Sequence, residues 1–72
     1  MHENIKIKIR QNGATVHEES MRLSVEKAIR LGVSMLRNYG DQYQVVILNN
    51  GNDVSGWEYR GGRLMPCNPC NI

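Results

Sequence analysis

Apolar and charged residues alternate strictly from Ile5 to Arg10. A two-residue period is typical of a strand with one buried and one solvated face. We expect Ile5, Ile7 and Ile9 to point to the core. The cations on the opposite, wet face are Lys6, Lys8 and Arg10.

The stretch from Ser24 to Gly40 instead has sustained helical periodicity. Its apolar positions recur at steps of three and four and so share one helix face: Val25, Ala28, Ile29, Gly32, Met35, Leu36 and Tyr39. Ser24 is the predicted N-cap, although a helix that begins earlier, after Ser20, is the alternative. Gly40 supplies the left-handed residue that ends the helix. Gly32 costs about 1 kcal/mol relative to alanine in mid-helix, which indicates a close approach to the sheet.

The pair Asn12-Gly13 predicts a tight hairpin between the first strand and a second one that begins at Ala14. A two-residue loop would pair Ile9 with Val16 on the core face. Two residues further on, the same register would place a carboxylate in the core. One extra residue at Glu18-Glu19 removes this conflict, so we predict a β-bulge there.

A third strand is predicted from Tyr43 to Leu48. Its last four residues form an apolar run, which is typical of burial on both faces. A second copy of the chain could cover the second face, so a homodimer is one interpretation. Residues 49–53 are a loop by composition. Further strands are expected over residues 54–60 and, more briefly, 63–65, where Pro66 ends the last one.

These elements predict an α+β fold of two layers, in which a ββαββ(β) antiparallel sheet carries one helix across one face. We expect one α+β domain over residues 1–66 and an irregular tail over residues 67–72. Seventy-two residues form a small core, and domains of this size often gain stability from a metal, a disulfide or a partner subunit.

The composition favours a soluble protein. The first four residues contain no apolar run, and the longest apolar run in the chain is too short to cross a membrane. We therefore expect no membrane partner and a cytoplasmic location. The formal net charge of +2 is close to neutral, which argues against a dedicated polyanion-binding protein.

Cys67-x-x-Cys70 is the motif with the most specific spacing. Two thiolates at this spacing can supply half of a tetrahedral zinc site. The other ligands would have to come from His2 and His17 or from the tail of a second copy. An incidental tail is the preferred interpretation, so we expect no cofactor; zinc is one alternative, and a disulfide or redox pair is the other. No set of nucleophile, acid and base is recognisable, so we expect no enzyme.

Two groups of side chains are candidates for partner binding. Cations lie along the outer face of the predicted helix at Lys27, Arg30 and Arg37, and along the first strand at Lys6, Lys8 and Arg10. If the helix covers the isoleucine face of the sheet, these two groups lie on opposite sides of the molecule. Trp57 and Tyr59 share one strand face. Core packing is the preferred interpretation for Trp57, and partner binding of both through an open sheet face is the alternative.

The layout also resembles a known class of proteins. A strand hairpin leads into Leu23-Ser24-Val25-Glu26-Lys27-Ala28-Ile29. The strand from Tyr43 to Leu48 then turns through Asn50-Gly51 to Trp57-Glu58-Tyr59. This order is similar to that of very small phage-encoded inhibitors, including anti-CRISPR proteins. The resemblance implies a stoichiometric inhibitor in the cytoplasm of a host cell, where basic residues compete with nucleic acid in a defence complex.

The leading functional hypothesis is therefore a small non-enzymatic binding module, an anti-CRISPR-like inhibitor that occupies the surface of a protein partner. The first alternative is a nucleic-acid-binding domain that uses one of the two groups of cations. The second alternative is a metal-stapled domain that uses Cys67 and Cys70.

Overall fold

A computed structural model of the chain describes residues 3–67, with the side chains of residues 53 and 54 left out of the description. The elements follow the predicted order of two strands, one helix and three strands. Their bounds are β1 (Glu3–Gln11), β2 (Ala14–Leu23), α1 (Val25–Tyr39), β3 (Tyr43–Asn49), β4 (Asn52–Arg60) and β5 (Arg63–Pro66).

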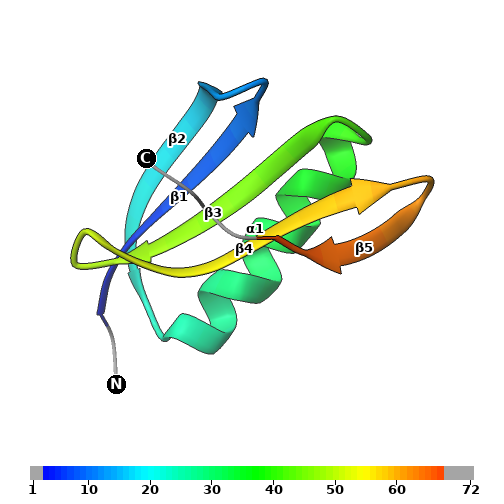
Figure 1. The fold of residues 1–72 in the computed structure, drawn as a ribbon. Coiled ribbons are helices and arrows are strands. Elements are labelled where there is room, and N and C mark those ends of the chain that lie inside the picture. The colour runs from blue at the N-terminus through cyan, green and yellow to red at the C-terminus, as the bar shows by residue number, and fades with distance from the viewer. Residues whose placement is uncertain (1–2, 68–72) are drawn as a thin grey trace.

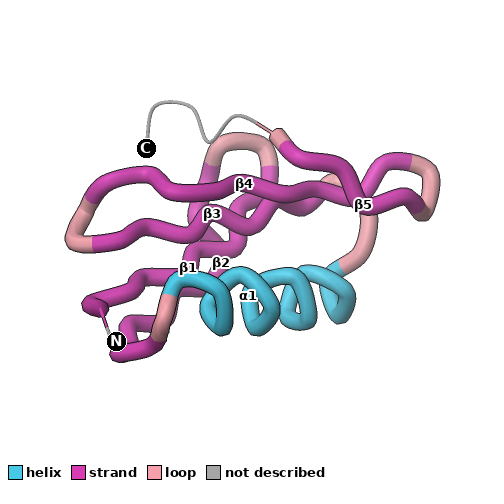
Figure 2. The backbone as a smooth tube through the Cα atoms, turned by 90° about the horizontal axis from the view of Figure 1, so that it is seen from below, coloured by secondary structure: helices cyan, strands magenta, loops and turns pink. Residues whose placement is uncertain are grey.

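All strands belong to one antiparallel sheet with the order β2-β1-β3-β4-β5 (Figure 1). Seen edge-on, the helix lies along one side of this sheet (Figure 2). The predicted α+β fold of two layers is thus confirmed, and the suggested fifth strand is present. We call the sheet surface that faces away from the helix the open face.

The core lies between α1 and the two central strands. Ile5, Ile7 and Ile9 of β1 are buried there, as the alternating pattern predicts. The other buried members of this cluster are Ala28, Leu36, Val45 and Ile47. Gly32 lies directly over it, because a Cβ atom at this position would stand only 2.6 Å from Cδ1 of Ile47 and 3.1 Å from Cγ2 of Val45. The predicted close approach at Gly32 is therefore confirmed.

The helix ends are set by the two predicted capping residues. Ser24 has extended backbone angles, and its Oγ accepts a hydrogen bond from the backbone N–H of Lys27 at 3.3 Å. At the other end, Gly40 has a φ of 89° and its N–H donates to the carbonyl of Leu36. The alternative of a helix that begins after Ser20 is wrong, because β2 continues to Leu23.

The β-bulge in β2 exists, but the prediction of its place was wrong. Ile9 pairs with His17 and Arg10 with Thr15, so the extra residue is Val16 rather than one of the two glutamates. Val16 is 47% exposed instead of packing in the core. The early bulge places Glu18 directly opposite Lys8 on the open face, where opposite charges attract across the strand pair.

The run Val45 to Leu48 is buried on both faces of the sheet, as predicted. Val46 and Leu48 face away from the helix, yet they are buried within the single chain. Their neighbours on β1 are Lys8 and Lys6, whose aliphatic stems can cover apolar surface. Burial of the second face of β3 therefore needs no second copy.

The predicted loop over residues 49–53 is shorter in the structure. Asn49 ends β3 and Asn52 begins β4, so the turn itself is Asn50-Gly51. Both turn residues have positive φ, 52° and 84°, as a type I′ turn requires. The predicted last strand, residues 63–65, extends by one residue to Pro66.

Candidate functional site

The open face carries the cations of the first strand. Lys6, Lys8 and Arg10 alternate with the buried isoleucines of β1, so all three belong to this face. They lie opposite Leu48, Val46 and Gln44 of β3. At the centre of the open face, the apolar side chains Val46 and Leu48 of β3 are thus buried beside a cationic strand.

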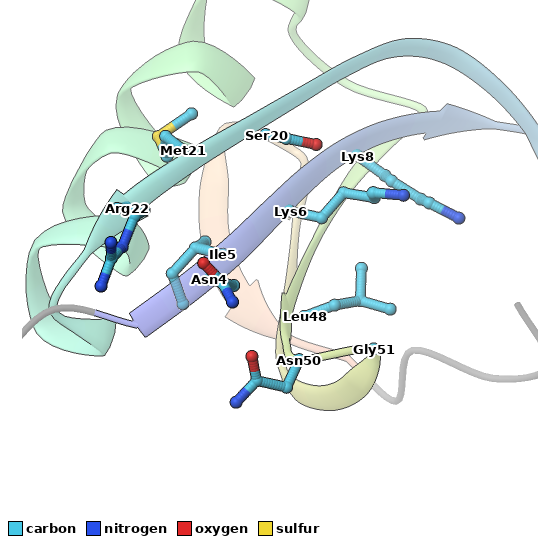
Figure 3. A pocket seen from close by; sticks show the side chains of 10 residues that line it. All are labelled: Asn4, Ile5, Lys6, Lys8, Ser20, Met21, Arg22, Leu48, Asn50 and Gly51. Carbon is cyan, nitrogen blue, oxygen red and sulfur yellow. The ribbon is translucent and has the colours of Figure 1, made fainter.

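A hollow of about 680 Å³ lies at the end of this face near the β3–β4 turn (Figure 3). Lys6 and Lys8 extend on the same side of the sheet as Leu48, and Asn50 and Gly51 form the lower border. Its polar lining residues are Asn4, Lys6, Lys8, Ser20, Arg22 and Asn50. Three of the lining side chains are cationic and none is a carboxylate, so the hollow suits a negatively charged group.

Carboxylates border the open face at two other points. Glu18 lies 3.6 Å from Nζ of Lys6 and 3.9 Å from Nζ of Lys8, which reduces their net charge without cancelling it. All these groups except Lys8 are about half exposed, so each pair adds little to stability. Arg10 turns toward the hairpin, where its Nη2 donates to the carbonyl of Gly13 at 2.6 Å.

Glu58 is the one buried charged residue among the described side chains. It lies on the open face opposite Gln44, whose Nε2 donates to its Oε1 at 3.0 Å. Nε of Arg60 donates to its other oxygen. The hydrogen bond from Gln44 holds the pKa of Glu58 below its ordinary value of 4.5, and Arg60 lowers this pKa further against the opposing effect of burial.

We expect this lowered pKa to appear as acid sensitivity. A carboxylate whose folded-state pKa is depressed stabilises the fold above its ordinary pKa, and this stability is lost as the pH falls below 4.5 toward the folded-state value. Urea unfolding at several pH values should show a steeper acid loss for the wild type than for Glu58→Gln. Glu26→Gln is the matched control, because Glu26 is 78% exposed. An NMR titration that places Glu58 at or above 4.5 would contradict the prediction.

The cations of the helix lie on the other side of the molecule, as the sequence predicts. Arg30 pairs with Glu26 one turn earlier at 3.2 Å, with both side chains more than three-quarters exposed. Arg37 donates from Nε to the hydroxyl of Tyr59 at 3.2 Å, and this hydrogen bond raises the pKa of Arg37. Lys27 is exposed near the N-terminus of the helix.

Trp57 and Tyr59 lie on the helix side of the sheet, where both pack against the core cluster. Core packing is therefore their observed role, and they are absent from the open face. Trp57 also lines a groove of about 360 Å³ between α1 and the β4–β5 hairpin. Arg30 and Arg37 also line this groove, so three of the eight predicted binding residues come together there.

The Cys67-x-x-Cys70 motif falls partly outside the described residues, because Cys70 lies beyond residue 67. Cys67 is half-buried, and its N–H donates to the carbonyl of Gly56 at 2.9 Å, which continues the hydrogen bonding to β4. Residues 3–67 contain no group of three or more histidine, cysteine or acidic side chains that could hold a metal. His17, in β2, instead contacts Glu19 at 2.7 Å.

Three residues that line the hollow were not identified from the sequence: Asn4, Arg22 and Asn50. Arg22 lies opposite Asn4 in the β1–β2 register, two residues beyond the pair Lys6–Ser20. The predicted alternation would have placed Arg22 on the open face had it been followed past the bulge. Asn50 lies beside the hollow only because of the way the β3–β4 turn folds, which the alternation of apolar and polar residues does not predict.

Comparisons of the chain with protein-family models, curated proteins and solved structures found no match. Within the described residues, α1 is neither long nor apolar enough to cross a membrane.

Proposed function

We propose that this protein is a small non-enzymatic binding module that occupies an acidic surface of a partner protein through its open face. The observation that carries the proposal is the hollow beside Lys6 and Lys8, which has three cationic side chains and no carboxylate in its lining. Complementary charge favours encounter with an acidic partner and fixes its orientation. In the form implied by the resemblance to phage inhibitors, the partner is a defence complex in the cytoplasm of a host cell.

The chemistry of the open face favours a protein over a single-stranded nucleic acid. Proteins that bind single strands stack bases on aromatic side chains. The described aromatic residues lie elsewhere: Tyr43, Trp57 and Tyr59 pack against the core cluster on the helix side, and Tyr39 is on the helix. The open face instead presents lysine side chains over the buried Val46 and Leu48, which suits a partner surface that carries carboxylates.

Removing charge from the open face tests the proposal. The tagged full chain and the double variant Lys6→Gln/Lys8→Gln are used to capture proteins from a nuclease-treated lysate of the native host. We expect one acidic protein to be retained in a stoichiometric amount by the wild type. The double variant should bind this protein at least about tenfold more weakly, because each lost charge contact weakens association.

The matched control is Lys27→Gln/Arg30→Gln, which removes the same charge from the helix. It should retain the partner as the wild type does. Circular dichroism confirms that both variants fold. Equal loss in the two double variants, or retention that depends on the helix pair alone, would overturn the choice of the open face.

The second candidate function is binding to the phosphate backbone of a nucleic acid. The same three cations of the hollow favour it. It predicts that duplex DNA binds the purified chain, that binding weakens steeply between low and physiological salt, and that Lys6→Gln/Lys8→Gln reduces the slope. If the wild type captures its partner from an untreated lysate but not from the nuclease-treated one, and DNA binding shows this slope, the second function replaces the first.

A further inference from the structure

β2 forms a long free edge of the sheet. It spans ten residues and pairs with β1 alone among the described strands. Most of its residues are exposed, and no other strand of residues 3–67 lies beside its outer backbone groups. Such an edge is a template for pairing with another strand unless charges, bulges or a covering segment prevent it.

The charges of β2 permit self-pairing in one register. Glu18 and Arg22 alternate with the other residues so that both belong to the open face, and Ser20 lies midway between them. Suppose that the β2 strands of two copies pair antiparallel about a two-fold axis that is perpendicular to the sheet and runs through Ser20. Each Glu18 then stands opposite Arg22 of the second copy. The two copies then form two cross-strand ion pairs, with Ser20 opposite itself.

Neighbouring registers that keep the open faces together are less favourable. Centring the pair on Glu18, Glu19 or Arg22 places that charged residue directly opposite its own copy, which destabilises a strand pair. Centring it on Met21 forms no ion pair on the open face. The Ser20 register also pairs residues 17–23 and so leaves the bulge at Val16 outside the paired segment.

The contacts of the single chain leave both charged groups available. Within the described residues Arg22 forms no ion pair, and it is exposed. Glu18 is 45% exposed, and its two oxygens stand 3.6 and 3.9 Å from lysine nitrogens; a carboxylate with this exposure has lone pairs for a further cation. Glu19, on the other face, would stand opposite Met21 rather than another charge.

We infer that β2 is a self-association edge, through which two copies of this chain form one continuous ten-stranded sheet centred on Ser20. The occupant of the edge is thus a second copy, selected by the reciprocal Glu18–Arg22 pairs. Both open faces would lie on the same side of the joined sheet. This inference does not rest on the proposed function, because it is argued from the backbone edge and the charge pattern of β2, although Arg22 also lines the hollow.

Sedimentation equilibrium of the full chain tests the inference between low-micromolar and near-millimolar concentration. The wild type should show twice the mass of one chain at the upper end. Arg22→Glu places two carboxylates opposite each other at both pairs and should weaken the dimer at least about tenfold. The double variant Glu18→Arg/Arg22→Glu exchanges the charges and should restore the dimer.

Arg63→Glu is the control, because it makes the same charge change in β5 at the opposite edge of the sheet. It should leave the dimer unchanged. A wild type with the mass of one chain throughout would overturn the inference. A dimer that Arg22→Glu does not weaken, or that the charge exchange does not restore, would exclude this register.

Discussion

Replacing Gly32 with valine should remove a large part of the stability of the fold. Even the first carbon of a side chain at this position meets Cδ1 of Ile47 at 2.6 Å and Cγ2 of Val45 at 3.1 Å. The two further methyl groups of valine add volume at this buried position, so the helix or the side chains of Ile47 and Val45 must shift. We expect a loss of about 3 kcal/mol, at the upper end of overpacking effects. A chain of this size has roughly 4–11 kcal/mol in total.

Urea unfolding followed by the fluorescence of Trp57 measures this loss. Ser34→Val is the matched control, because Ser34 lies on the same helix at an exposed position and should change stability by less than about 0.5 kcal/mol. Gly32→Ala should fall between the two, since its better helix propensity of about 1 kcal/mol offsets part of the clash. A Gly32→Val chain as stable as the control would show that the helix does not lie this close.

Truncating Ile7 to alanine should lower the free energy of unfolding by a similar amount, because it removes side-chain volume from the core instead of adding it. Ile7 is fully buried at the centre of β1, and its Cγ2 lies 3.7 Å from the position of a Cβ at Gly32. The truncation removes apolar contacts and leaves a cavity beneath the helix. We expect a loss of about 2–5 kcal/mol in the free energy of unfolding.

Val16→Ala is the comparison for this variant. Val16 also lies in the β1–β2 hairpin, but it is the bulged residue and is 47% exposed, so its truncation should cost less than about 0.5 kcal/mol. Had the bulge been at the two glutamates, Val16 would belong to the core and its truncation would resemble that of Ile7. Equal losses at the two positions would therefore contradict the observed register.

The local elements of the fold could be predicted because each depends on neighbouring residues. The alternation in β1 identifies its two faces, and Ser24 and Gly40 bound the helix through their own side-chain and backbone properties. The place of the bulge could not be predicted in the same way. Within the hairpin alone, a bulge at Val16 and a bulge at Glu18 are equally acceptable. The bulge at Val16 is favoured only when the strands are paired, because it brings Glu18 next to Lys6 and Lys8.

The candidate site was predicted in part. The division of the cations between two sides of the molecule follows from the strand alternation and the helix position. The hollow itself does not, because it joins residues from β1, β2 and the β3–β4 turn. Likewise, the side occupied by Trp57 depends on the irregular pairing between Ile47 and Leu48, which shifts β4 by one residue. Such shifts come from tertiary packing rather than from the pattern of a single strand.

The strand order has a consequence for how the chain assembles. Every neighbouring pair of strands is a hairpin except β1–β3, which joins residues far apart in the chain. The molecule is therefore two locally formed halves, a hairpin and a three-stranded meander, that meet along a single seam. Gly32 lies over this seam, against Ile7 on one side and Val45 and Ile47 on the other. We therefore expect the closure of this seam to be the slow, entropically costly step of folding. The helix packs over the seam at Gly32, the position where it carries no side chain.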